Sequence, residues 1–157
     1  SNRLRRTGAA NPRHLEGKAM KYTATQWNTA ADKEKFVRQF KKFVERGFPE
    51  SLFTKGFYNR MSMMRGHIAH YNQDGFFDAQ FITSERRADF LHHWAFAPCY
   101  GDPEYTWSDV EAELSAWLQE HPEHEARERN QHAAIIEDIE RKEFARLSAK
   151  YSGAAVV

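Results

Sequence analysis

Apolar side chains recur every three or four residues through most of this chain, which is the spacing of a helix that buries one face. The clearest case begins near Thr29 or Asp32, and both are good N-cap residues. Gly47 follows at the position of a left-handed C-cap. Between these limits, apolar residues fall on one side of the helix and basic residues on the other, which is expected to face solvent. The apolar side consists of Phe36, Val37, Phe40, Phe43 and Val44, and the basic side of Lys33, Lys35, Arg38, Lys41 and Lys42.

Four further segments have the same period, over about residues 52–63, 84–96, 108–120 and 122–151. Ser108 with Glu111, or Thr106 with Asp109, has the spacing of a capping box at the start of the third segment. In the last segment residues 123–132 are almost wholly polar, so we expect them to project into solvent or to meet a partner, and we expect Gly153 to end the helix. The apolar positions of this segment are Ile135, Ile136, Ile139, Phe144, Leu147 and Tyr151.

One stretch departs from the helical period. Asn72 and Gly75 are the first and fourth residues of a four-residue turn, in which Asn accepts a backbone hydrogen bond and Gly adopts a positive φ. Apolar and polar residues then alternate from Phe77 to Phe81, as in a strand with one buried face. We therefore predict a β-hairpin over residues 67–82, in an α+β fold that is mainly helical, with about five helices.

The length of 157 residues suits one domain, which we place at residues 20–152. Residues 1–19 are interpreted as a flexible basic leader or an added extension, and residues 153–157 as a tail. No apolar run approaches the ~20 residues of a membrane helix and the start has no apolar signal core, so a cytoplasmic protein is expected. The single Cys99 excludes an internal disulfide framework. We expect one core that includes Phe36, Phe40, Phe43, Phe81, Leu91, Trp94, Val110, Leu114 and Trp117.

Charge is unevenly distributed along the chain. Residues 1–87 hold 17 Lys and Arg and 8 acidic residues, a net charge of +9, whereas residues 88–126 hold 9 acidic residues and no Lys or Arg. This asymmetry can mark a surface that binds nucleic acid, or the two parts can pack together and neutralise each other. We favour neutralisation, because the basic residues alternate with acidic ones instead of forming a basic arm.

Four short motifs carry a resemblance: residues 66–71 (GHIAHY), 74–76 (DGF), 98–103 (PCYGDP) and 107–111 (WSDVE). Together they resemble small uncharacterised proteins that bacteriophages, plasmids and related mobile elements encode, over about residues 53–118. The resemblance implies this genetic setting, and it implies no activity, cofactor or catalytic role.

Arg65 and His70 are separated by four residues. This spacing is similar to the motif of HEPN-type ribonucleases, which are small helical proteins with the pair at a dimer interface. The resemblance implies a metal-independent ribonuclease, in which His70 is the acid or base for the ribose hydroxyl and Arg65 stabilises the phosphorane-like charge. Two features depart from the motif. Gly66 replaces the usual polar residue after the Arg, and the predicted hairpin would put His70 on a strand.

Other histidines offer further chemistry. His67 and His70 would share one face of a helix, where they could chelate a metal, but they would diverge on a strand. His92 or His93 could join a site with a nearby carboxylate. Histidines more often serve as isolated polar residues than as ligands, so we predict no metal site and no cofactor.

Three functions follow from these patterns. Lys55, Arg60 and Arg65 lie among aromatic residues, a combination that can bind a nucleic-acid strand by stacking and by neutralising phosphates. The Arg65 and His70 pair gives a ribonuclease as the second function. The third, which we favour, is a non-enzymatic accessory protein that binds another macromolecule, expected to be a protein partner or a second copy of this chain. The long last helix and the lack of a complete catalytic set support it.

Overall fold

The computed structural model describes residues 21–97 and 101–156, and helices are the only regular secondary structure within these ranges. The prediction of a mainly helical chain is confirmed, and the prediction of an α+β fold is wrong. Residues 1–19 and Cys99 lie outside the described residues. The elements are α3 (Ala30–Glu45), η1 (Glu50–Leu52), α4 (Lys55–Met64), η2 (Gly66–His70), α5 (Gln73–Gln80), α6 (Ser84–Phe96), α7 (Ser108–Glu120) and α8 (Glu123–Val156).

Helix α3 begins and ends where its sequence predicts. Thr29 is the N-cap and forms a full capping box with Asp32, so that each side chain accepts the other residue's backbone N–H. Gly47, with a φ of +81°, supplies the left-handed residue after the helix. Phe48 follows with a φ of 62°, which is unfavourable for a non-glycine residue, and burial of its ring against Phe43 compensates.

The segment predicted as a hairpin forms η2 and α5 instead. Asn72 is the N-cap of α5, because its Oδ1 accepts the backbone N–H of Gly75 at 2.6 Å. Gly75 therefore lies inside a helix and has no positive φ. Phe76 and Phe77 are both buried, which successive residues of a strand with one buried face cannot be. In so short a segment the apolar residues fit the period of a strand as well as that of a helix, and the capping hydrogen bond of Asn72 favours the helix.

Replacing Asn72 with alanine is expected to lower the free energy of unfolding by about 1 kcal/mol, because a first-turn N–H of α5 loses its acceptor. Asn72→Ser retains an acceptor and is expected to recover most of this loss. Chemical denaturation of the two variants measures the difference. Equal losses for alanine and serine would show that the cap does not stabilise α5.

Aromatic rings fill the centre of the molecule. The ring of Phe36 stacks on that of Phe57, and the ring of Phe40 packs against that of Trp94, each with centroids 5.1 Å apart. Eight of the nine predicted core residues are at most 2 % exposed, and Trp117 is partly buried against the same cluster. The predicted core is therefore confirmed.

Acidic residues of α7 pair with cations from the N-terminal half of the chain. The pairs are Lys33 with Asp109 (2.9 Å), Arg65 with Glu111 (2.7 Å) and Lys21 with Glu113 (2.9 Å). The predicted neutralisation between the two parts is confirmed. The predicted capping boxes of α7 are wrong, because Trp107 is its N-cap, without a side-chain hydrogen bond, and the carboxylates of Asp109 and Glu111 bind cations instead.

Lys33 is wholly buried, although its position in the helical pattern predicts a solvent-facing side chain. Its Nζ donates to the carbonyl oxygens of Pro103 and Thr106, at 3.1 and 2.9 Å, in addition to Asp109. The ammonium group therefore joins α3 to the loop before α7. Periodicity along α3 carries no information about this loop, which is why the prediction for Lys33 is wrong.

The polar start of α8 packs against the domain. Glu128 is buried and accepts hydrogen bonds from Arg87 at 2.7 Å and from Arg127 at 3.1 Å. Arg129 donates to Asp89 of α6 at 2.9 Å. Residues 123–132 were expected to project into solvent or to meet a partner; instead ion pairs fix this polar segment to α6 of the same chain, while half of its residues remain exposed.

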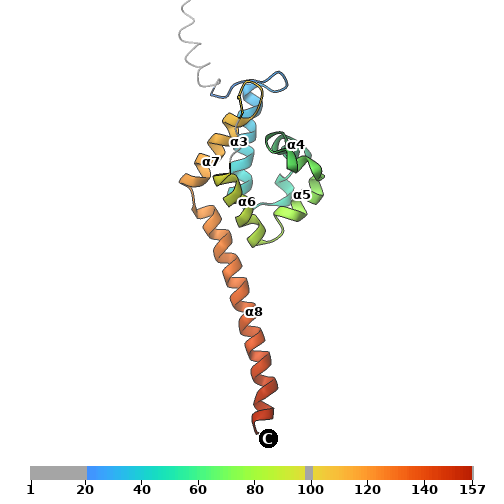
Figure 1. Ribbon diagram of the computed structural model, residues 1–157, viewed down its shortest axis with the longest axis vertical. Helices are drawn as coiled ribbons and strands as arrows, with labels where there is room; N and C mark the ends of the chain where they lie inside the picture. The colour runs from blue at the N-terminus through green and yellow to red at the C-terminus, as the bar shows by residue number, and fades with distance from the viewer. Residues whose placement is uncertain (1–20, 98–100, 157) are drawn as a thin grey trace, which may run out of the picture.

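The rest of α8, from residue 133 onward, extends away from the domain (Figure 1). From residue 133 onward nearly every residue whose burial is described is exposed, and the helix continues through Gly153 to Val156, beyond its predicted end. We call residues 133–156 the arm. Within the described part of the chain, no helix has both the length and the apolar character that a membrane crossing requires.

Candidate functional site

Arg65 connects α4 to η2 and is only 3 % exposed. Its Nε donates to Glu111 Oε2 at 2.7 Å, and its guanidinium carbon lies 4.4 Å from the ring centroid of Trp94, a cation–π contact. One Nη also lies 3.5 Å from the carbonyl oxygen of Trp94. These contacts join the α4–η2 connection to α6 and α7, and Glu111 balances the charge of Arg65.

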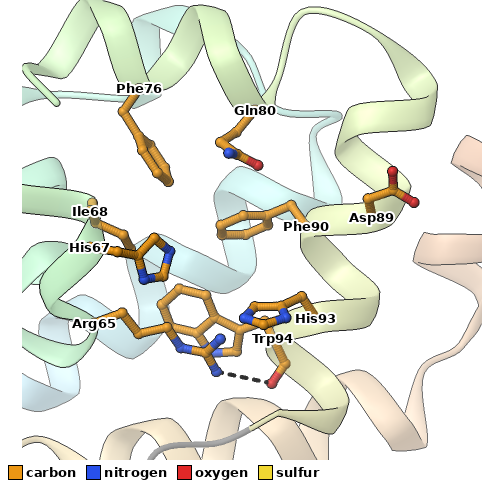
Figure 2. A pocket seen from close by; sticks show the side chains of 9 residues that line it. All are labelled: Arg65, His67, Ile68, Phe76, Gln80, Asp89, Phe90, His93 and Trp94. Atoms are coloured by element: carbon orange, nitrogen blue, oxygen red, sulfur yellow. Dashed lines mark hydrogen bonds between the residues drawn. The ribbon is translucent and has the colours of Figure 1, made fainter. Parts of the chain in front are cut away.

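A cavity of about 250 Å³ lies beside Arg65, between η2, α5 and α6 (Figure 2). Its apolar wall consists of buried side chains: Ile68, Phe76, Phe90 and Trp94. Exposed or half-buried polar side chains form its rim: His67, Gln80, Asp89 and His93. Figure 2 shows Gln80 and Phe76 entering from α5, opposite the side chains that come from η2 and α6. Three elements thus supply one concave, mostly apolar site with a few polar groups.

The rim of the cavity is polar and carries little charge. The rings of His67 and His93 lie edge to face, with centroids 6.5 Å apart. Partial burial and the nearby Arg65 and His67 lower the pKa of His93, so its imidazole is neutral at pH 7 and offers one donor and one acceptor. Asp89 forms an ion pair with Arg129 at 2.9 Å.

Arg65 and His70, the predicted catalytic pair, do not meet at this cavity. His70 is exposed at the end of η2 and is not one of the lining residues, whereas His67 is. Sequence reasoning missed that His93 and Gln80 line the same cavity as Arg65, because they come from α6 and α5 and no sequence spacing connects them. The Arg-x4-His spacing therefore identified an arginine at a cavity but the wrong histidine beside it.

The residues predicted to bind nucleic acid are in three different environments. Lys55 is exposed at the start of α4. Arg60 is partly buried, and its Nη2 lies 3.7 Å from Asp32. Arg65 is buried in its pair with Glu111. Lys55, Arg60 and Arg65 therefore do not form one exposed basic surface.

The histidines interact with carboxylates and aromatic rings. His92 Nδ1 lies 3.3 Å from Glu125, and His124 stacks on Trp117 with ring centroids 5.0 Å apart. In residues 21–97 and 101–156, no three or more His, Cys, Asp or Glu side chains are grouped so that they could hold a metal ion. No catalytic role is assigned to Cys99.

The arm is the second candidate site, and it exposes apolar side chains that a helix of a monomer would bury. The exposed fractions are 46 % for Ile135, 40 % for Ile136, 55 % for Ile139, 72 % for Phe144 and 57 % for Tyr151. At 100° per residue, Ile136, Phe144, Leu147 and Tyr151 fall within an arc of about 80° on one side of the helix. We call these four residues the stripe. Ile136, Phe144 and Tyr151 are exposed, Leu147 is half-buried, and Glu140 lies within the same arc. Large apolar side chains gathered on one side of an exposed helix are typical of an interaction site.

Comparisons with known protein families, with curated proteins and with solved structures found no match to this chain. The resemblance to proteins of mobile elements over residues 53–118 therefore stays a prediction.

Proposed function

We propose that the protein acts by binding another protein through the arm, and that this partner is a second copy of the chain, which binds antiparallel to the first. The observation that carries the proposal is the stripe, which is exposed on a helix whose polar first half is fixed to its own domain. A helix that is only a structural element of a monomer has the reverse arrangement, with its apolar residues against the core.

The spacing of the stripe suits a helix–helix contact. Its positions fit steps of three and four residues from Ile136 to Tyr151, with Glu140 as the one polar member of the series. Ile136 and Leu147 are eleven residues apart, which is close to three full turns, so both lie on nearly the same side of the helix. The 24 residues of the arm span about 36 Å, and the stripe from Ile136 to Tyr151 covers about 23 Å of that length. The arm can therefore pack along a second long helix.

The order of charges on the arm favours an antiparallel pair. Glu137, Asp138 and Glu140 come first, and the later charged residues are mostly basic: Arg141, Lys142, Arg146 and Lys150, with Glu143 among them. A parallel pair would put the three early carboxylates of both copies side by side. An antiparallel pair centred between Glu143 and Phe144 puts them beside the basic end of the partner, and it also puts Ile136 opposite the partner's Tyr151. The interface is then self-complementary, as a two-fold dimer requires.

Oligomeric state tests the proposal directly. Light scattering on a sizing column is expected to give twice the 18.4 kDa chain mass for the full chain. Phe144→Glu is expected to weaken association by about a hundredfold or more, because the two-fold axis places two buried charges at the centre of the contact. Ala145→Glu is the matched control, since the neighbouring residue points away from the stripe and its substitution should leave the dimer intact.

Disulfide cross-linking determines the orientation, in a Cys99→Ser background that leaves no native thiol. We expect that Ile136→Cys and Tyr151→Cys proteins cross-link when mixed but that neither cross-links with itself. Self-cross-linking of each variant would show a parallel pair and contradict the antiparallel arrangement. A monomer at all concentrations, or a dimer unaffected by Phe144→Glu, would contradict the proposed function.

A further inference from the structure

We propose that the cavity between η2, α5 and α6 binds a small, uncharged nitrogen heterocycle of the nucleobase class. This site is separate from the arm and does not depend on the proposed self-association. It rests on three properties of the cavity, namely its size, the aromatic groups of its wall, and the polar but charge-balanced groups of its rim.

The size of the cavity limits the ligand to one or two rings. An apolar cavity of about 150 Å³ is large enough for a benzene molecule. The cavity here measures about 250 Å³, so it admits a pyrimidine or a purine and excludes a dinucleotide or a peptide of several residues. Ligands of this size usually bind where most of their surface is covered, and four buried side chains already form the wall.

The wall favours a flat ring. Phe76, Phe90 and Trp94 contribute three aromatic side chains, and Figure 2 shows them around the space that Gln80 enters. Aromatic side chains hold planar ligands by offset stacking and edge-to-face contacts. The indole N–H of Trp94 is buried and has no hydrogen-bond partner in the described structure, which leaves one donor unsatisfied in a residue that lines the cavity.

The rim favours a ring that both donates and accepts hydrogen bonds. The Gln80 amide has donor and acceptor atoms, and so does the neutral imidazole of His93, while the ring nitrogens of His67 can form hydrogen bonds as well. The edges of pyrimidines and purines carry the same mixture of N–H, ring nitrogen and carbonyl groups, whereas a hydrocarbon ring carries none. Among the described residues the half-buried side-chain amide of Gln80 has no hydrogen-bond partner, so it can bind a ligand in the cavity.

The charges around the cavity argue against an anion. Arg65 is the lining cation, and Glu111 binds it at 2.7 Å. Asp89 is the lining carboxylate, and Arg129 binds it at 2.9 Å. A phosphate or carboxylate would have to compete with Glu111 for Arg65, and its negative charge would lie near Asp89. An uncharged ligand meets neither obstacle.

Isothermal titration calorimetry of the full chain with adenine, hypoxanthine, cytosine and uracil tests the proposal, with inorganic phosphate as the anionic probe. We expect at least one base to bind with a Kd below about 1 mM, and phosphate to bind more weakly than that base. His67→Ala and Gln80→Ala should each raise its Kd by about three- to tenfold, the effect of one lost hydrogen bond. His70→Ala is the matched control, because His70 is an exposed histidine of the same 3₁₀ helix outside the cavity, and it should leave the Kd unchanged.

Three results would overturn the proposal. These are no binding of any of the four bases below about 1 mM, tighter binding of phosphate than of every base, and equal weakening by His70→Ala and His67→Ala. His67 is exposed and Gln80 half-buried at the rim, so their alanine variants should remain folded, and circular dichroism verifies this. Because all of these variants lie outside the arm, loss of base binding without loss of the dimer would separate this site from the proposed function.

Discussion

Asp109→Ala is expected to lower the free energy of unfolding by about 3–5 kcal/mol, because it leaves the buried ammonium of Lys33 without a carboxylate. The remaining partners of Lys33 Nζ are two carbonyl oxygens, which carry no full charge to balance it. Asp109 also accepts the backbone N–H of Thr23 at 2.9 Å, so the substitution loosens the chain before α3 as well. Chemical denaturation measures the loss.

A double-mutant cycle separates the buried charge from the other contacts of Asp109. Lys33→Met places an unbranched apolar chain in the same buried space, and the pair Lys33→Met with Asp109→Ala should recover a large part of the single-variant loss. If the loss in the double variant equals the sum of the two single-variant losses, the ammonium and the carboxylate do not stabilise each other. Lys41→Met is a suitable control, because Lys41 is a partly exposed cation on the same helix and should change stability by less than about 1 kcal/mol.

Helical periodicity was enough to predict most of the fold. The predicted segment at residues 84–96 coincides with α6, and the capping box at Thr29 and the glycine cap at Gly47 are where the pattern puts them. These features succeed because each depends on contacts within a few residues. The large apolar residues on the predicted faces also meet in one core, since a helical chain of this size has few other places to bury them.

Sequence patterns failed where a polar residue obtains its partner from far along the chain. Lys33 and Asp109 are 76 residues apart, and nothing near Lys33 distinguishes it from the exposed lysines of the same helix. Glu111 was predicted as a capping residue of α7, but it binds Arg65 from α4–η2 instead. The cavity was missed for the same reason, because His67, Gln80 and His93 are brought together only by packing of η2, α5 and α6.

The region of residues 66–82 shows a different limit. Its apolar residues match a strand and a short helix about equally well, and Asn72 favours either a turn corner or a helix N-cap. The neighbouring structure decides between them. The Tyr58 hydroxyl binds the carbonyl oxygens of Ile68 and Tyr71, and Gln73 Nε2 donates to the Phe53 carbonyl at 2.7 Å, so α4 and the residue after η1 hold η2 and the start of α5 in place. A local sequence window does not contain these contacts.

Phe43→Ala is expected to lower the free energy of unfolding by about 3–5 kcal/mol. The substitution removes the α3 ring that packs against α4, against the loop before α4 and against the residue after α5. Four rings surround it with centroids 5.1 to 5.6 Å away: Phe48, Phe53, Phe57 and Phe81. All four are nearly as buried as Phe43 itself and come from separate segments, so the space left by the ring cannot close without moving several of them. Thermal and chemical denaturation are compared with Phe96→Ala, in which a 60 % exposed ring is removed and a change within about 0.5 kcal/mol is expected. A loss for Phe43→Ala no larger than that of Phe96→Ala would mean that the aromatic cluster is not the core that holds these helices together.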